Sequence, residues 1–207
     1  MELKLEHAST ADVYKLFIGC IVPRPIAWIT SQSPEGVVNL APFSFFNGVA
    51  SNPPTISVSF AYNTQNQDGR KDTLANIQQT GEFVVNAATE PNEVFVNDSA
   101  VNYPRERGEP HELGIETRPS CLVVPPRLAL TPVALECRLE REIPVGEGPG
   151  SATLVLARVV HAFVRDDLVN ERMHVDVKNL APIGRLAGHD YCYVHDIFTL
   201  RRRSFDE

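Results

Sequence analysis

A short run of residues in the first half of the chain joins two cations to the start of a predicted helix. The run is Gly69-Arg70-Lys71-Asp72-Thr73, and the helix is expected over residues 72–80. The N-terminus of a helix carries unpaired backbone N–H groups and about half a positive charge. Together with Arg70, Lys71 and the Thr73 hydroxyl, it could hold a phosphate group. In the alternative interpretation, Asp72 caps the helix and both cations are simply solvated.

The second feature is a strand that runs into a proline and three aromatic rings. Residues 39–47 read Asn-Leu-Ala-Pro-Phe-Ser-Phe-Phe-Asn. Pro42 removes a backbone donor and is typical of a strand edge or break, where N–H and C=O groups are free to face a ligand. A planar heteroaromatic ligand needs such groups along its edge and apolar side chains against its face. Taken alone, the rings of Phe43, Phe45 and Phe46 are better explained as core.

The third feature, residues 182–191, reads Pro-Ile-Gly-Arg-Leu-Ala-Gly-His-Asp-Tyr. It is either a binding loop or a bend before the last strand. His189, Cys192 and His195 suggest a metal, but in a strand residue 192 would point away from the other two. No carboxylate or second cysteine completes the set, and we therefore expect no metal site.

Composition limits the class of protein. The chain has 207 residues, of which 43% are hydrophobic, and we expect one domain over residues 1–207. A net charge of −7 argues against a nucleic-acid partner or an anionic membrane surface. The polar start and the lack of any run of ~20 apolar residues predict a soluble, cytoplasmic protein. The scattered cysteines, Cys20, Cys121, Cys137 and Cys192, are predicted to be free, buried thiols.

The elements that must position these features are mostly strands. Val13, Leu16, Phe17 and Cys20 have helical spacing after a capping Ser9 or Thr10. Strands are predicted over residues 25–31 and 37–43, which form a hairpin, and over 55–60, 82–87, 133–144, 152–164 and 191–200. Short helices are predicted over 72–80 and 91–99, and residues 100–131 have no clear period. Closure into a barrel would hide so many strand edges economically.

Together, these pieces resemble the flavin reductase-like, FMN-binding split β-barrel family. It includes the reductase components of two-component flavin monooxygenases and the flavoredoxin-type proteins. The resemblance rests on the order and spacing of five motifs: PRPIAWITS at 23–31, NLAPFSFF at 39–46, NPP at 52–54, RKDT at 70–73 and FVVN at 83–86. The segment 183–191 extends it toward the C-terminus, whereas residues 100–131 match nothing.

The resemblance implies a mainly β, Greek-key-like barrel with short flanking helices and a homodimer with FMN near the interface. Carried over by position, the phosphate would be held by Arg70, Lys71 and Thr73. The ribityl chain or the ring would be approached by Ser57 and Ser59. The isoalloxazine would be contacted by Asn39, Leu40, Ala41 and Ser44, with Trp28, Ile29 and Thr30 on the neighbouring strand, and His189 and Tyr191 would close the site.

The activity implied is an NAD(P)H-dependent flavin oxidoreductase, with NADH or NADPH as the donor. The flavin carries the redox chemistry, so no catalytic side chain is assigned. Reduced flavin would serve a partner monooxygenase or another acceptor. Two alternatives stay open: an FMN-holding electron carrier without nicotinamide activity, and a barrel that binds another ligand or acts as a structural subunit.

Overall fold

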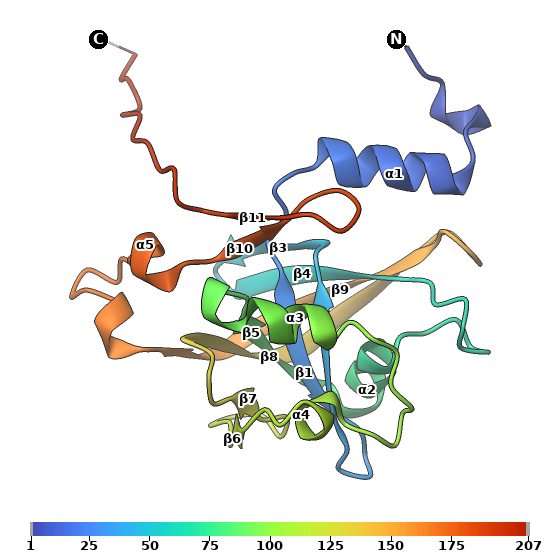
Figure 1. The fold of residues 1–207 in the computed structure, drawn as a ribbon, viewed down its shortest axis with the longest axis horizontal. Helices are drawn as coiled ribbons and strands as arrows, with labels where there is room; N and C mark the ends of the chain where they lie inside the picture. Colours follow the sequence, from blue (N-terminus) through green and yellow to red (C-terminus); the bar gives the residue numbers. More distant parts are fainter. Residues whose placement is uncertain (1, 206–207) are drawn as a thin grey trace.

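The protein, seen here as a computed structural model that describes residues 2–205, is built mainly from antiparallel strands (Figure 1). The strands are β1 (Ala27–Gln32), β2 (Val38–Phe43), β3 (Phe46–Ser51), β4 (Pro54–Ala61), β5 (Glu82–Ala87), β6 (Thr117–Arg118), β7 (Arg127–Leu128), β8 (Val133–Val145), β9 (Ala152–Val164), β10 (Ile183–Arg185) and β11 (Tyr191–Tyr193). The helices are α1 (Thr10–Cys20), α2 (Asp72–Thr80), α3 (Glu93–Asp98), α4 (Glu109–Glu112) and α5 (Val177–Leu180), with 3₁₀ turns at Leu5–His7, Glu90–Asn92 and Asp166–Leu168.

Seven strands form one curled sheet in the order β2-β1-β5-β8-β9-β4-β3. Strands β2 and β3 follow each other along the chain, yet they lie at the two ends of this order, so the sheet stays open between them. The chain crosses this open seam at Ser44 and Phe45. The predicted mainly β, split-barrel architecture is thereby confirmed, and so is the β1–β2 hairpin.

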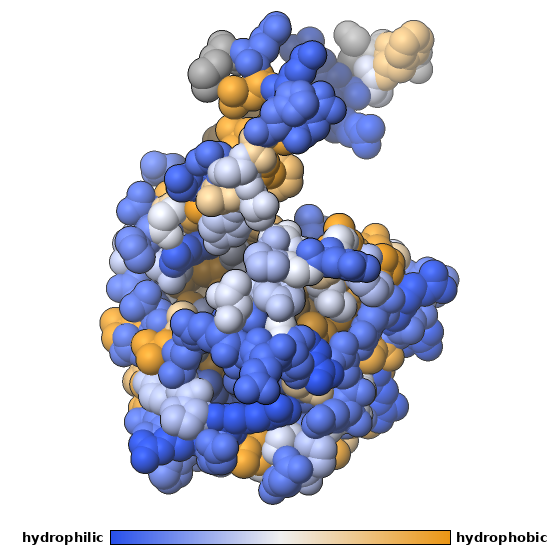
Figure 2. Space-filling view, turned by 90° about the vertical axis from the view of Figure 1, so that its right-hand side faces the viewer, coloured by the Kyte–Doolittle hydropathy of each residue, from blue (hydrophilic) through white to orange (hydrophobic). Residues whose placement is uncertain are grey.

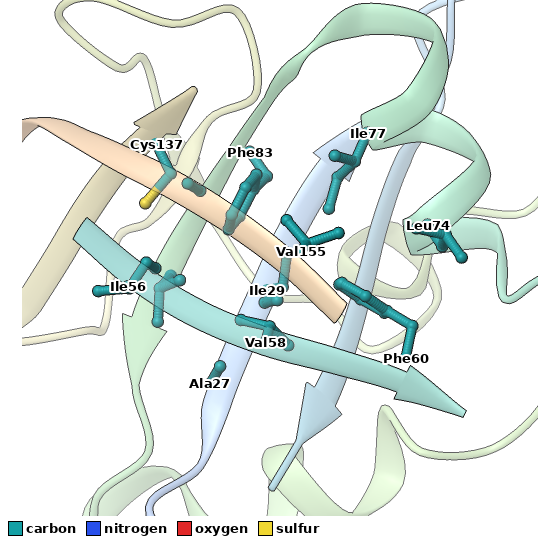
Figure 3. Close-up of a cluster of buried hydrophobic side chains, with 12 residues drawn as sticks. Ala27, Ile29, Ile56, Val58, Phe60, Leu74, Ile77, Phe83, Cys137 and Val155 are labelled. Carbon is teal, nitrogen blue, oxygen red and sulfur yellow. The ribbon is translucent and has the colours of Figure 1, made fainter. Parts of the chain in front are cut away.

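The interior of the sheet holds one hydrophobic cluster (Figure 3). Strand β4 alternates Ile56, Val58 and Phe60, which enter the cluster, with hydroxyl residues that do not. Helix α2 closes one end of the barrel with Leu74 and Ile77. Burial of such side chains contributes roughly 1.5–3 kcal/mol each, which fixes the start of α2 against the barrel.

Helix α1 forms as predicted but has no buried residue. The Ser9 hydroxyl accepts a hydrogen bond from the Asp12 N–H at 3.1 Å, which caps the helix. The apolar side chains of Tyr14 and Phe17 are 56% and 42% exposed. In Figure 2, the upper part of the molecule, which carries α1, stands apart from the body across a hollow. The helix therefore presents apolar surface that nothing within residues 2–205 covers.

Several expectations were wrong in detail. The last strand ends at Tyr193 rather than at Leu200 because β11 pairs only with the three-residue β10. His189 and His195 therefore do not lie in one strand. Strand β3 was missed because Gly48 and a bulge interrupt its alternation. Of the four free cysteines, only Cys137 is buried; Cys20 and Cys121 are exposed and Cys192 is intermediate.

The irregular segment 100–131 contains α4 and the two-residue strands β6 and β7. Helix α4 contacts β2, and its Glu109 bonds to Leu40 of that strand. None of the helices within residues 2–205 combines the length and the apolar character needed to cross a lipid bilayer.

Candidate functional site

A cleft of about 300 Å³ lies at the open seam of the barrel. Its walls come from the end of β2, from β4, from the start of α2 and from the loop after α3. Six of the predicted site residues line it: Asn39, Ala41, Ser44, Ser59, Lys71 and Thr73. The rings of Phe43 and Phe45 line it too, and Phe43 also packs against the core with its ring centroid 4.6 Å from that of Phe60. One aromatic side chain thus serves both core and cleft.

The start of α2 forms one end of the cleft. Lys71 is the N-cap and makes no side-chain capping bond, so Asp72 is the first helical residue and not the cap. The Thr73 hydroxyl accepts a hydrogen bond from the Asn39 amide at 2.7 Å, which ties the helix start to β2. Gly69 lies shortly before the helix at φ +70°, where a Cβ would collide with the Tyr62 ring. Backbone donors, a cation and a hydroxyl therefore converge at one point.

Arg70 is arranged differently from Lys71. Its guanidinium pairs with the Asp68 carboxylate at 2.7 Å and donates to the Gln78 side chain at 2.9 Å. The residue is exposed and does not line the cleft. Of the two predicted cations, Lys71 is therefore the one whose side chain borders the cleft.

Glu109 also lines the cleft, although no sequence motif singles it out. Its carboxylate accepts the backbone N–H of Leu40 at 2.7 Å, on the free edge of β2. The side chain is buried, and burial raises the pKa of the Glu109 carboxyl above its ordinary value. Because the Leu40 N–H is already bonded and Pro42 has none, this edge offers a ligand few backbone donors.

Arg24 lies in the motif at residues 23–31, but the sequence analysis assigned it no role. Its buried guanidinium donates to the carbonyls of Ile18 and Leu186 at 2.8 Å each. It also donates from Nε to the Ser44 hydroxyl at 3.2 Å. Arg24 therefore joins the end of α1 and the β10–β11 hairpin to the cleft wall. No local sequence pattern predicts this role, because Leu186 lies 162 positions after Arg24.

The loop after α3 is fixed to the barrel by a buried pair. The Trp28 indole N–H donates to the Ser99 hydroxyl at 2.8 Å, and both residues are buried. From Ser99 the chain passes along the cleft to Tyr103, while Tyr14 of α1 borders the cleft from another side. The polar tip of Trp28 thus positions one wall of the cleft and does not itself line it.

The other predicted site residues lie outside the cleft. Ile29 belongs to the core, and the buried Thr30 hydroxyl donates to the Pro126 carbonyl at 2.6 Å. Leu40 is buried beneath the edge, and Ser57 lies on β4 facing the Asn47 carbonyl at 3.5 Å. His189 is exposed on the β10–β11 turn. Tyr191 borders a separate hollow of about 390 Å³ beside Glu93 and Tyr193. Their contact with a ligand stays a prediction.

Comparison with known proteins places this chain in a family. Residues 18–181 match the profile of the flavin reductase like domain. An uncharacterised protein of Halalkalibacterium halodurans is 40% identical over 210 residues, covering 100% of this chain and 99% of that protein.

Two solved structures are also similar to this chain over nearly its whole length. Nitrilotriacetate monooxygenase component B from Bacillus cereus superposes with a TM-score of 0.90 at 36% identity, covering 97% of this chain and 98% of that one. The 2-nitrobenzoate 2-nitroreductase NbaA of Pseudomonas fluorescens gives 0.87 at 29% identity, covering 99% and 98%. With the open barrel, the seam cleft and a family match over most of its length, the chain belongs to the flavin reductase-like family.

Proposed function

We propose that this protein binds FMN in the seam cleft and acts as an NAD(P)H-dependent flavin oxidoreductase. The observation that carries the proposal is the polarity of the cleft. One end has Lys71, Thr73 and the N-terminus of α2, which suit a phosphate. The other end combines the apolar Ala41 and Phe43 with the hydroxyl of Ser44, which suits a flat ring with polar edges.

The residues present fit FMN better than a flavin without a phosphate. Lys71 would pair with the phosphate, the Thr73 hydroxyl would donate to it, and Asn39 would hold Thr73 in place. Ser59 on β4 also lines the cleft, and its backbone N–H donates to the Phe45 carbonyl at 2.8 Å; its hydroxyl would meet the polyhydroxyl chain of the ligand. When bound, FMN supplies a ring that accepts hydride from a nicotinamide and passes electrons on.

The chain's own contribution is binding and orientation. The cleft is open on one side, and its volume of about 300 Å³ is at the lower end for small-molecule sites. A bound ring would therefore keep one face accessible, as a nicotinamide donor requires. No side chain needs to act as an acid or base in the hydride transfer, so we assign none.

The open side of the cleft also fits a homodimer. Tyr14 and Phe17 of α1 and Phe198 and Leu200 of the C-terminal segment are exposed apolar side chains. Exposed apolar side chains grouped on one element, as on α1, often mark an interaction site. A second copy that packs on α1 would cover this surface beside the cleft, since Tyr14 borders both. Light scattering should give twice the chain mass, and Phe17→Asp should shift the population toward monomer.

The names of two relatives indicate which acceptor receives the electrons of the reduced flavin. The B. cereus relative is by name a component of a monooxygenase, and the P. fluorescens relative is by name a nitroreductase. We propose that reduced flavin made here serves a partner monooxygenase.

The experiment is steady-state oxidation of NADH and NADPH with added FMN. Turnover above the rate of free FMN supports the proposal. A protein that binds FMN but oxidises neither nicotinamide would instead be an electron carrier.

A further inference from the structure

A cluster of three potential metal ligands lies on the outer face of the barrel, away from the seam cleft. Glu136 of β8 and His161 of β9 are cross-strand partners. Since the neighbouring Cys137 enters the core, Glu136 points to the opposite face. There, the segment between β6 and β7 covers it and brings Cys121 close.

The Glu136 carboxylate is held rigidly. The residue is only 2% exposed, and its two oxygens accept the backbone N–H groups of Cys121 at 2.7 Å and Leu122 at 2.6 Å. A buried carboxylate held by backbone donors is fixed in position before any ligand arrives. Each oxygen keeps a free lone pair, because a carboxylate has about four acceptor positions.

The His161 ring adds an unexplained atom. Its Nδ1 is buried and makes no hydrogen bond of acceptable geometry, although it lies 3.1 Å from Oε1 of Glu136. Buried polar atoms without a partner are uncommon and need a physical reason. The nitrogen lies at ion-pair distance from the carboxylate but outside hydrogen-bond geometry, and a metal ion contacted by both groups would satisfy it.

The Cys121 thiol completes the set. The sulfur, the Glu136 oxygen and the His161 nitrogen all lie within 4.8 Å of one another, and no other such group of three occurs within residues 2–205. In a tetrahedral zinc site, with bonds of about 2.0–2.3 Å, ligand atoms are ~3.3–3.8 Å apart. Small side-chain rotations would therefore close the site. Cys121 is exposed, which leaves an approach for the ion.

We propose that Cys121, Glu136 and His161 bind a divalent zinc ion, with water as the fourth ligand. Binding releases the thiol proton to solvent and uses the neutral imidazole. The charges of a thiolate, a carboxylate and Zn²⁺ then cancel, so the buried carboxylate gains a counter-ion. A thiolate with an imidazole favours zinc over magnesium or calcium, which prefer oxygen ligands.

The ion would connect the turn formed by residues 119–126, which is the segment between β6 and β7, to strands β8 and β9. This turn reaches β1, because the Pro126 carbonyl accepts the Thr30 hydroxyl. Binding to the folded state alone would raise stability with ion concentration. The site does not depend on flavin, so the proposal is independent of the one made for the cleft.

The test uses the purified full chain, stripped of metal, titrated with Co²⁺ and then Zn²⁺. Tetrahedral cobalt bound to a thiolate absorbs in the red, where oxidised flavin does not. We expect one equivalent of cobalt to give this band, zinc to abolish it, and zinc to raise the unfolding midpoint. Cys121→Ser should remove the band and weaken zinc binding at least tenfold, and His161→Gln should weaken it similarly.

Cys20→Ser is the matched control, because Cys20 is also an exposed free thiol but stands outside the cluster. It should bind both ions as the wild type does. FMN binding by Cys121→Ser should be unchanged, so a failure here is distinguishable from a failure of the cleft proposal. An absent red cobalt band, or zinc affinity unaffected by Cys121→Ser, would overturn the site and leave Glu136 as an anchor for the turn only.

Discussion

Replacing Lys71 by Met separates the phosphate contact from the rest of the flavin site. Met keeps much of the apolar stem of Lys and removes its charge. Lys71 borders the cleft at the α2 N-terminus and has no side-chain capping bond to lose. Its loss should therefore affect a bound phosphate far more than the fold.

The expected size follows from the contact. A hydrogen bond to a charged group contributes about 1.5–3 kcal/mol, and every ~1.4 kcal/mol is tenfold in affinity. Lys71→Met should therefore raise the Kd for FMN about 10- to 150-fold. Since the cleft is open, solvent screening favours the lower half of this range.

Arg70→Met is the matched comparison. Arg70 is already paired with Asp68 and bonded to Gln78, so moving it to a phosphate would exchange one exposed ion pair for another. Such pairs contribute ~0–1 kcal/mol, and the Kd should rise no more than about fivefold.

The assay is quenching of flavin fluorescence, with FMN and with riboflavin, at low and high salt. Lys71→Met should weaken FMN binding and leave riboflavin binding unchanged, and the FMN effect should shrink with salt. Two results would contradict a phosphate contact at Lys71: an equal loss of riboflavin binding, or a larger loss of FMN binding for Arg70→Met than for Lys71→Met.

Three further variants test the cleft walls. Glu109→Gln should stabilise the protein at neutral pH, and this gain should vanish toward acid pH. Burial raises the pKa of the Glu109 carboxyl in the folded protein, so the wild type loses stability as the pH rises through that pKa, whereas Gln stays neutral. Urea unfolding across pH checks this, and a pH-independent difference would contradict it. Ser99→Ala should lower the unfolding free energy by about 1–3 kcal/mol, since the Trp28 indole N–H loses its buried partner; a change under ~0.5 kcal/mol would mean that another acceptor replaces it. Arg24→Met should lower stability by at least about 2 kcal/mol and also weaken FMN binding, as buried carbonyls lose their donor and Ser44 its neighbour; unchanged urea and fluorescence titrations would show that Arg24 does not organise the cleft.

Local patterns predicted the parts of this fold that local interactions decide. Residues close together in the sequence predict the β1–β2 hairpin, the alternation of β4 and the boundaries of α2. The left-handed Gly81, at φ 73°, ends α2 as expected. The grouping of Asn39, Ser59 and Lys71 around one cleft required the resemblance in motif order, because these residues lie on three different elements.

The rest depended on contacts between distant segments. The bond between Glu109 and Leu40 spans 69 positions, and no periodicity in residues 100–131 announces it. The tail after Tyr193 alternates like a strand but has no neighbouring strand to pair with in the described chain. Cys20 was predicted to be a buried thiol, like the other scattered cysteines, yet nothing in the described chain covers the part of α1 that carries it.

Anaerobic mixing of the FMN-loaded protein with NADH or NADPH shows whether the bound flavin accepts electrons from a nicotinamide. We expect the absorbance of oxidised flavin to disappear faster than for free FMN, with one nicotinamide oxidised for each flavin reduced. Bound FMN that stays oxidised with both nicotinamides would contradict the claim that this cleft is the site of a nicotinamide-dependent flavin oxidoreductase.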